Sequence, residues 1–428
     1  MQENWKNILE AEVAPVKETL KKAGKDTLAE MFDLCYRSTL ETTTEMLPDG
    51  TAFVITGDIP AMWLRDSSAQ VRHYIPAATR HPEMAEVIDG LIRRQMDYIC
   101  IDPYANAFNR EPNNNRFSED RTEALPIIWE RKYEIDSLCN PMHLAYLFWQ
   151  ETGRTGWLNE RFGKAVRTML DVWKLEQHHE NSPYYFERFT GPASDTLTHE
   201  GKGTPVGYTG MTWCGFRPSD DACRYGYLVP ANLFAAKVLL EVSEIAEKLM
   251  QNPALAAECL ALRGEILHGV EEFGVIDHPE FGKMYAYETD GLGNYNLMDD
   301  ANVPSLLSLP YLECCDTDDE LYQNTRRFVL SRQNPYYFEG TAAKGIGSPH
   351  TPNQFIWPIA LSMQGLTSCD KAERAALMQM LENTTAGTNL MHESFHRDDP
   401  AQFTRSWFAW ANSLFSEFAL SYLTDIAE

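Results

Sequence analysis

Helical periodicity is the feature of this sequence that most restricts its fold. Apolar residues recur three and four positions apart in about a dozen segments, as they do on one face of an α-helix. Four short stretches, 53–56, 184–189, 284–287 and 336–338, predict strands. A mainly α fold follows. The predicted helical segments are 4–24, 27–46, 61–78, 83–100, 134–151, 160–179, 229–249, 254–272, 317–332, 353–366, 371–383 and 404–425.

Two architectures accommodate this many helices: a helical repeat solenoid and a closed double ring. No fixed sequence repeat is visible, which weakens the solenoid interpretation. An (α/α)6 barrel, a toroid of six helical hairpins, would allot roughly 35 residues to each helix with its loop, and a chain of 428 residues divides that way. No segment has the composition of a linker, so we expect residues 1–428 to form a single domain.

Long connecting loops of such a ring gather at one end and build a pocket there. The longest stretches without helical periodicity are 101–132, 181–228, 274–316 and 334–352. Long loops in a compact fold often carry function. We therefore expect these four stretches to form the pocket walls.

Composition excludes several classes of partner and site. The chain has 37 Lys and Arg against 62 Asp and Glu, a net charge of −25, which argues against nucleic acid and anionic membranes. No apolar run is long enough to span a bilayer. The nine cysteines form no C-x-x-C pair, which favours reduced thiols over disulfides or a thiolate zinc site. With its polar N-terminus, the sequence predicts a cytoplasmic protein without metal or cofactor.

The first candidate functional stretch, residues 57–68, follows a predicted strand and precedes a helical pattern. Pro60 fits the first turn of a helix. Trp63, Arg65 and Asp66 combine a flat apolar face with a donor fork and acceptors, which suits the apolar face and hydroxyl rim of a sugar. A core aromatic with a local ion pair is the alternative, and spacing alone slightly favours it.

The second candidate stretch, residues 212–221, ends a long loop. Its final residues Asp220 and Asp221 are adjacent carboxylates that repel each other, which predicts a raised pKa for one of them, as a general acid requires. Arg217 lies close enough in sequence to offset that effect. The alternative is that Ser219 and Asp220 are turn or cap residues, and local sequence favours this.

The third candidate stretch, residues 389–395, holds Glu393 in a non-periodic loop beside His392. A glutamate there can act as a general base on water, although a solvated surface charge is the simpler interpretation of this stretch alone. His350 and Gln354 flank the start of another predicted helix.

Taken together, residues 57–67, 215–221 and 391–394 resemble glycoside hydrolase family 125, the bacterial and fungal exo-α-1,6-mannosidases. The resemblance covers nearly the whole chain, and the first of these motifs is long and specific. It implies an (α/α)6 barrel, metal-independent hydrolysis with inversion, and an α-1,6-linked manno-oligosaccharide as substrate. Asp220 matches the family's general acid and Glu393 its general base. The resemblance further implies that the terminal-mannose pocket is lined by Trp63, Arg65, Asp66, Asp136, Arg217, His350 and Gln354.

Two other classes of function stay open at this point. A sugar epimerase or isomerase on a similar helical ring would use His350 and His392 to exchange protons. A catalytically inactive mannoside-binding protein would use Trp63 and neighbouring tyrosines and release no mannose. Neither the glycan met in the cell nor the oligomeric state is visible in the sequence.

Overall fold

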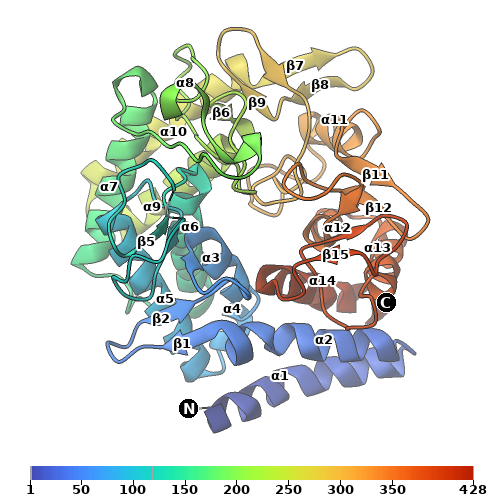
Figure 1. The fold of residues 1–428 in the computed structure, drawn as a ribbon. Coiled ribbons are helices and arrows are strands. Elements are labelled where there is room, and N and C mark those ends of the chain that lie inside the picture. The colour runs from blue at the N-terminus through green and yellow to red at the C-terminus, as the bar shows by residue number, and fades with distance from the viewer. Residues whose placement is uncertain (1, 118, 428) are drawn as a thin grey trace.

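Helices make up most of the regular structure in the computed structural model, and the mainly α fold predicted from periodicity is confirmed (Figure 1). The structure describes residues 2–117 and 119–427, so positions 1, 118 and 428 of the predicted single domain lie outside it. Within the described part of the chain, the α-helices are α1 (Gln2–Lys22), α2 (Asp26–Ser38), α3 (Leu64–Arg72), α4 (Ile75–Ala78), α5 (Pro82–Ile101), α6 (Ile135–Thr152), α7 (Glu160–Glu176), α8 (Thr198–Gly201), α9 (Val229–Lys248), α10 (Pro253–Phe273), α11 (Glu320–Val329), α12 (Pro358–Leu366), α13 (Lys371–Asn383) and α14 (Ala409–Ala427).

Each predicted helical segment contains an observed helix, and the differences lie at the ends. The segment 27–46 leaves the α-helix at Ser38, continues as a π-helix over Thr39–Thr43 and ends in strand β1. The segment 61–78 begins with strand β3 and then divides into α3 and α4. Pro60 therefore precedes a strand, and the expectation that it opens the helix is wrong. The helix starts at Leu64 because Trp63 is held in an extended conformation, with φ −75° and ψ 137°.

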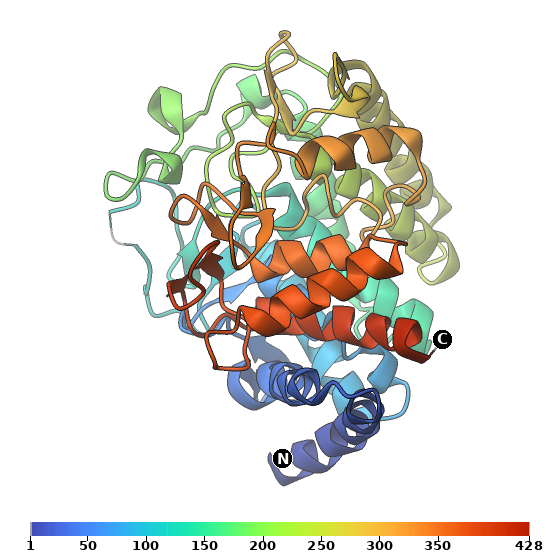
Figure 2. The ribbon, with the colours of Figure 1, turned by 90° about the vertical axis from the view of Figure 1, so that its right-hand side faces the viewer.

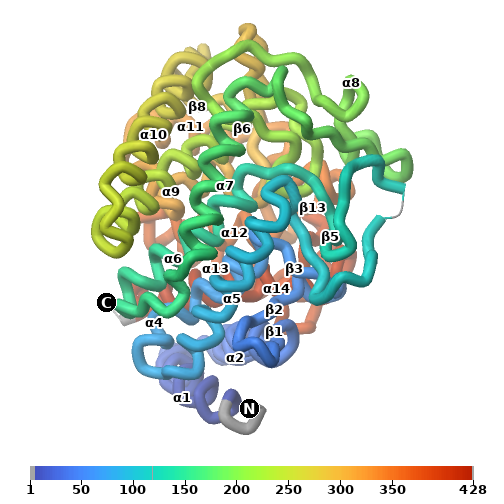
Figure 3. The backbone as a smooth tube through the Cα atoms, turned by 90° about the vertical axis from the view of Figure 1, so that its left-hand side faces the viewer, coloured from blue at the N-terminus to red at the C-terminus, as the bar shows by residue number. Residues whose placement is uncertain are grey.

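The helices lie around a common interior (Figure 1). Along the inner layer α12 contacts α14, α14 contacts α3, α3 contacts α6, and α6 contacts α9. Outer helices pack against them or each other: α10 on α9, α13 on α12, and α7 beside α5 along the flank that Figure 3 shows. The N-terminal helices α1 and α2 lie below α14 (Figure 2). This layered ring is the arrangement that a helical barrel requires.

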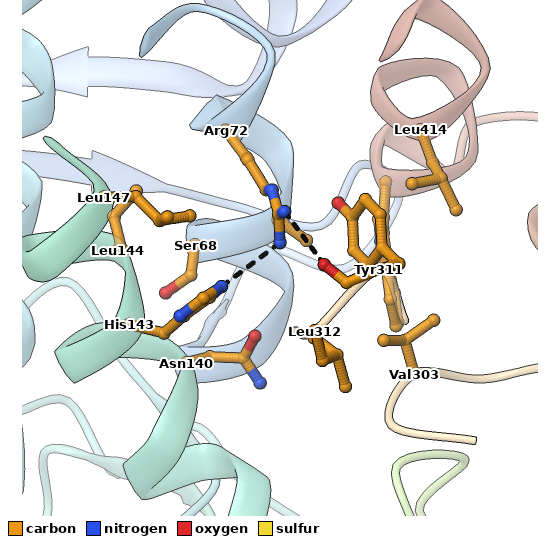
Figure 4. Close-up of a pocket in the computed structure, with 12 residues that line it drawn as sticks. Ser68, Arg72, Asn140, His143, Leu144, Leu147, Val303, Tyr311, Leu312 and Leu414 are labelled. Atoms are coloured by element: carbon orange, nitrogen blue, oxygen red, sulfur yellow. Dashed lines mark hydrogen bonds between the residues drawn. The ribbon is translucent and has the colours of Figure 1, made fainter. Parts of the chain in front are cut away.

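One part of the interior is built without regular helix. Between α10 and α11, residues 297–315 form turns and bends. The Arg72 guanidinium donates to the Tyr311 carbonyl at 3.2 Å, lies 3.9 Å from the centre of the Tyr311 ring, and approaches His143 Nε2 at 3.3 Å (Figure 4). These residues line a cavity of ≈20 Å³, which has room for about one water molecule. Arg72 thus ties the irregular segment to α3 and α6.

Short antiparallel sheets lie in the loops, but one of the predicted strands is not among them. The prediction of a strand at 184–189 is wrong: Glu187 makes only an isolated bridge to Arg121, while Tyr184 and Phe186 are buried among other aromatic rings. The described strands are β1 (Thr44–Met46), β2 (Ala52–Val54), β3 (Met62–Trp63), β4 (Ala107–Phe108), β5 (Ile128–Glu130), β6 (Tyr227–Leu228), β7 (Val275–His278), β8 (Gly282–Tyr285), β9 (Glu288–Thr289), β10 (Tyr295–Asn296), β11 (Tyr337–Glu339), β12 (Lys344–Ile346), β13 (Phe355–Ile356), β14 (Ser394–His396) and β15 (Phe403–Thr404).

Candidate active site

A polar cavity of ≈330 Å³ collects most of the predicted site residues. Its volume lies at the lower end of the range of small-molecule sites. Each of the four stretches predicted to form pocket walls contributes lining residues, among them Lys132, Arg188, Asn302 and Thr351. The predicted residues that line the cavity are Trp63, Arg65, Asp66, Asp220, His350 and Glu393.

A three-stranded sheet positions the first motif. In β3, Trp63 pairs with Ala107 of β4, and β4 pairs in turn with β5. The chain enters α3 directly after Trp63, so Arg65 and Asp66 fall in the first helical turn, where the helix dipole favours a carboxylate. Trp63 is buried, and among the described residues its indole nitrogen has no hydrogen-bond partner. Trp63 therefore contributes part of its ring to the wall, while its indole nitrogen is buried.

Arg65 is the centre of a buried charge cluster. Its Nη1 donates to Glu134 Oε2 at 2.5 Å and to Asp136 Oδ2 at 3.0 Å. Its Nη2 donates to Asp220 Oδ1 at 3.1 Å, while Asp66 Oδ2 lies 3.7 Å from Nε. The Arg65 side chain is only 3% exposed. One guanidinium thus faces four carboxyl groups in a site shielded from water.

The expected repulsion between Asp220 and Asp221 is not the main influence on the pKa values of the carboxyls around Arg65. Burial opposes ionisation of Asp220, but the charges of Arg65 and Lys132 outweigh it and lower the pKa of Asp220. Burial raises the pKa of Glu134 well above its ordinary value; Arg65 opposes this rise, and the charge of Asp220 adds to it. Asp220 is therefore not the member of the adjacent pair that carries the expected raised pKa. Glu134, which the sequence analysis missed, holds a proton far more strongly than an ordinary glutamate.

Asp66 is the second cavity carboxyl with a shifted pKa. Burial raises its pKa, Arg65 lowers it, and the charge of Asp220 raises it again, to about 6. A cavity that places several acids against one arginine therefore keeps protons at mildly acidic and neutral pH.

The two adjacent aspartates face different surroundings. Asp220 has a positive φ of 67°, its side chain lines the cavity, and its carbonyl accepts from Lys132 Nζ at 2.7 Å. Asp221 is 1% exposed and lies behind His350, whose Nδ1 is 3.5 Å from Asp221 Oδ1. Ser219 Oγ also donates to Asp221, at 3.4 Å. Of the two carboxyls, the one that faces the cavity is therefore Asp220.

His350 carries a positive charge at neutral pH in this setting. Burial of the ring disfavours the imidazolium, but the hydrogen bond and charge of Asp221 outweigh it. The charges of Asp220 and Glu393 act in the same direction and raise the pKa of His350 to about 9. The cavity wall between the two candidate catalytic carboxyls thus carries a cationic donor.

Glu393 immediately precedes strand β14, the middle strand of a second three-stranded sheet. Its side chain is 7% exposed and its Oε1 lies 3.5 Å from Arg405 Nη1. Arg405 is held in turn by Asp58, with Nε to Oδ1 at 2.9 Å. Asp58, from the first motif, therefore supports Glu393 through an arginine near the opposite end of the chain.

Three predicted residues lie outside the cavity lining. Asp136 is fully buried behind Arg65. Arg217 is buried and donates from Nε to Glu288 Oε1 at 2.6 Å, so it braces the loop that carries Asp220. Gln354 has a positive φ of 71°, and its carbonyl accepts from the Arg397 amide at 3.0 Å. In the structure these residues support the walls from behind.

His392 does not face the cavity with His350. It is 1% exposed, its ring stacks on Phe403 at 3.8 Å, and its Nε2 lies 3.3 Å from the Thr385 carbonyl. The paired histidines that a proton-exchanging epimerase would need do not share a site. Among the described residues no cluster of His, Cys, Asp and Glu has the arrangement of a metal site, and no helix is both long and apolar enough to cross a bilayer.

Comparison with known proteins places this cavity in a family. A family model described as metal-independent α-mannosidase (GH125) matches residues 25–420. A solved metal-independent α-mannosidase of Streptococcus pneumoniae, in a non-productive complex with α-1,6-mannobiose, superposes with a TM-score of 0.96. It is 48% identical, and the match covers 98% of this chain and 99% of that one.

Two further matches are more distant. The meiotically up-regulated gene 157 protein of Schizosaccharomyces pombe is 38% identical over 97% of this chain and 85% of its own length. The glucoamylase of Saccharomycopsis fibuligera has a TM-score of 0.60 at 10% identity, over 94% of this chain and 95% of that one. At that identity the likeness concerns the fold alone.

The charge on His350 generates a prediction. Asp221→Asn removes the principal cause of its raised pKa, so the pKa should fall from about 9 toward the ordinary 6.5. NMR titration of the imidazole resonances, assigned with His350→Gln, measures this. Because the folded pKa exceeds the unfolded value, the proton's contribution to stability is complete below pH 6.5 and is lost as the pH rises through 9. An unchanged pKa in Asp221→Asn would contradict the assignment.

Proposed function

The chain belongs to the family of metal-independent α-mannosidases, GH125, and we propose from this premise that it removes non-reducing terminal α-1,6-linked mannose with inversion at the anomeric carbon. Membership makes the protein a glycoside hydrolase that acts on α-mannosides. The linkage, the stereochemistry and the two catalytic residues are the content of the proposal.

One observation carries the proposal: Asp220 and Glu393 line the same cavity, and each is held by its own arginine. They come from different loops and contact different cations. An inverting glycosidase needs one carboxylic acid beside the leaving oxygen and one carboxylate that activates water on the other face of the sugar. Asp220 takes the first role and Glu393 the second.

The two roles are assigned by the family resemblance, and the surroundings of the two carboxyls suggest how each would act. Glu393 faces Arg405, which keeps a carboxylate in place to accept a proton from water. Asp220 belongs to the Arg65 cluster, in which protons are retained. As the glycosidic bond breaks, Asp220 gives a proton to the leaving oxygen, and water deprotonated by Glu393 forms the new bond to carbon 1. Exchange of protons with solvent then restores both groups.

The remaining lining residues suit one terminal sugar. Trp63 offers an apolar face, and Asp66, His350 and Thr351 offer polar atoms to hydroxyl groups. The solved relative holds α-1,6-mannobiose, which supports the same substrate class here. A 1,6 linkage adds a rotatable C5–C6 bond, so its leaving sugar can turn away from walls that other linkages would meet.

All nine cysteines are free thiols, which supports the proposal of a cytoplasmic location.

The linkage preference predicts the outcome of a simple assay. Among α-1,2-, α-1,3-, α-1,4- and α-1,6-mannobiose, only the last should be hydrolysed rapidly, with mannose as the product detected by chromatography. A linear 1,6-mannan should lose mannose from its end without internal fragments. Comparable rates on α-1,2-mannobiose would contradict the linkage, and binding without release of mannose would favour a non-catalytic binding protein.

The assignment of the acid predicts a substrate-dependent loss. A sugar alkoxide needs a proton as it leaves, whereas a dinitrophenolate hardly does. Asp220→Asn should therefore lower kcat on α-1,6-mannobiose by about 10²–10⁴-fold and largely spare dinitrophenyl α-mannoside. Steady-state kinetics on both substrates measures this.

Asp221→Asn is the matched control, because it removes a neighbouring carboxylate that lies behind His350. It should affect both substrates alike. If Asp221→Asn shows the selective loss instead, the acid is Asp221. If both variants lose activity equally on both substrates, the proton donor is another cavity carboxyl.

A further inference from the structure

The Arg65 cluster contains more carboxyl groups than its positive charge can balance. Arg65 is within 3.7 Å of four of them, and the three side chains other than that of Asp220 are at most 7% exposed. The next cation, Lys132, is engaged by Asp195 at 2.6 Å and lies 3.8 Å from Glu130. Buried carboxylates without a partner charge retain protons. Arg65 therefore neutralises only part of the negative charge of the cluster, and at least one of the carboxyl groups holds a proton.

Two carboxyls of the cluster, those of Glu134 and Asp220, are held by the same two donor side chains. Two carboxyls held together in this way can hydrogen-bond to each other only when one of them is protonated. The Asn106 amide Nδ2 approaches both, at 3.5 Å from Glu134 Oε1 and 3.4 Å from Asp220 Oδ1. Arg65 binds the same pair through its two terminal nitrogens. The two acids are thus clamped side by side.

We propose that Glu134 is a positioning residue for the general acid: it stores the proton that Asp220 delivers to the leaving oxygen. Glu134 precedes α6, its side chain is fully buried, and it does not line the cavity, so it acts through Asp220. This inference rests on the proposed function, because it deepens the role given to Asp220.

The cycle balances in protons. In the free enzyme the positive charges of Arg65 and Lys132 favour the anion at Asp220, and the shared proton stays on Glu134. As the leaving oxygen gains electrons from the breaking C–O bond, the proton held by Glu134 passes to Asp220, and Asp220 delivers it to the leaving oxygen. The pair is left with one proton fewer until solvent resupplies it, while Glu393 returns to solvent the proton it took from water.

Other ionisable groups around the pair modify its proton affinity without replacing this role. Asp136 shares Arg65 with Glu134, and Asp66 faces Arg65 from the same helix. Lys132 donates to the Asp220 carbonyl, not to its carboxyl, and is bound by Asp195. The remaining facing groups are Glu130, which accepts from Asn106, and His350, which Asp221 holds.

Glu134→Gln tests the proposal, because glutamine preserves the size of the side chain and cannot store the proton. Without a second acid, Asp220 faces only the cations that favour its anion. We expect a change in the pH profile of kcat/KM on α-1,6-mannobiose, at the alkaline limb along which activity falls with rising pH. In Glu134→Gln this limb should move to lower pH by at least about 1 pH unit. The rate on dinitrophenyl α-mannoside should change little, since that leaving group needs no proton.

Ser137→Ala is the matched control, since Ser137 Oγ donates to Glu134 Oε2 at 2.8 Å and the change leaves both carboxyls in place. In Ser137→Ala, the alkaline limb of the kcat/KM profile should coincide with that of the wild type. If Glu134→Gln loses activity equally on both substrates with the limb unmoved, Glu134 has only a structural role. If the wild type releases no mannose from mannobiose, the proposed function itself has failed, which is a separate result.

Neutron diffraction of the wild-type enzyme at neutral pH decides the matter even if Glu134→Gln does not fold. The proposal requires a deuteron on the line between a Glu134 oxygen and an Asp220 oxygen. Two carboxylates without a deuteron between them would overturn it.

Discussion

The contact between the Arg65 guanidinium and its four carboxyl neighbours is the interaction on which the rest of the site depends. Arg65 opens α3, Glu134 and Asp136 open α6, and Asp220 lies on the long loop before α9, so one side chain joins two inner helices to the loop that carries the acid. Removing one partner of a buried ion pair typically costs about 3–5 kcal/mol, because the other charge is left unpaired. The same burial that makes the cluster costly to disturb also retains the proton that hydrolysis needs.

A second arginine contacts the other carboxyl of the proposed catalytic pair. Arg405 is bound strongly by Asp58 and approaches Glu393 at 3.5 Å, so Glu393 keeps a nearby positive charge without a tight ion pair. The helices surround the site, and the short sheets position individual side chains within it: Trp63 lies in β3, and β14 begins immediately after Glu393. The two carboxyls are thus paired differently, Asp220 within a crowded acidic cluster and Glu393 beside a single arginine.

Local signals in the sequence were sufficient for the helices, and insufficient for the roles and the partners of the candidate residues. Helical periodicity is a property of each segment, so segments such as 229–249 and 371–383 were placed almost to the residue. Strands of two residues such as β3 show no alternation, and their pairing is set by distant segments. Glu134 lies 69 positions from Arg65, and Asp58 lies 347 positions from Arg405, so no spacing rule indicates either pair. Asp220 and Glu393 were found through family resemblance, whereas the raised pKa of Glu134 emerges only from the folded cluster.

The claim that Asp220 and Glu393 act from opposite faces of the sugar is tested most directly by the anomer that is released first. Proton NMR of an α-mannoside digestion, recorded in the first minutes before mutarotation, distinguishes the two anomers of mannose. The account predicts β-mannose, because water held by Glu393 enters opposite the departing oxygen. First-formed α-mannose would mean retention, and Glu393 would then be a nucleophile or a bystander instead of a base.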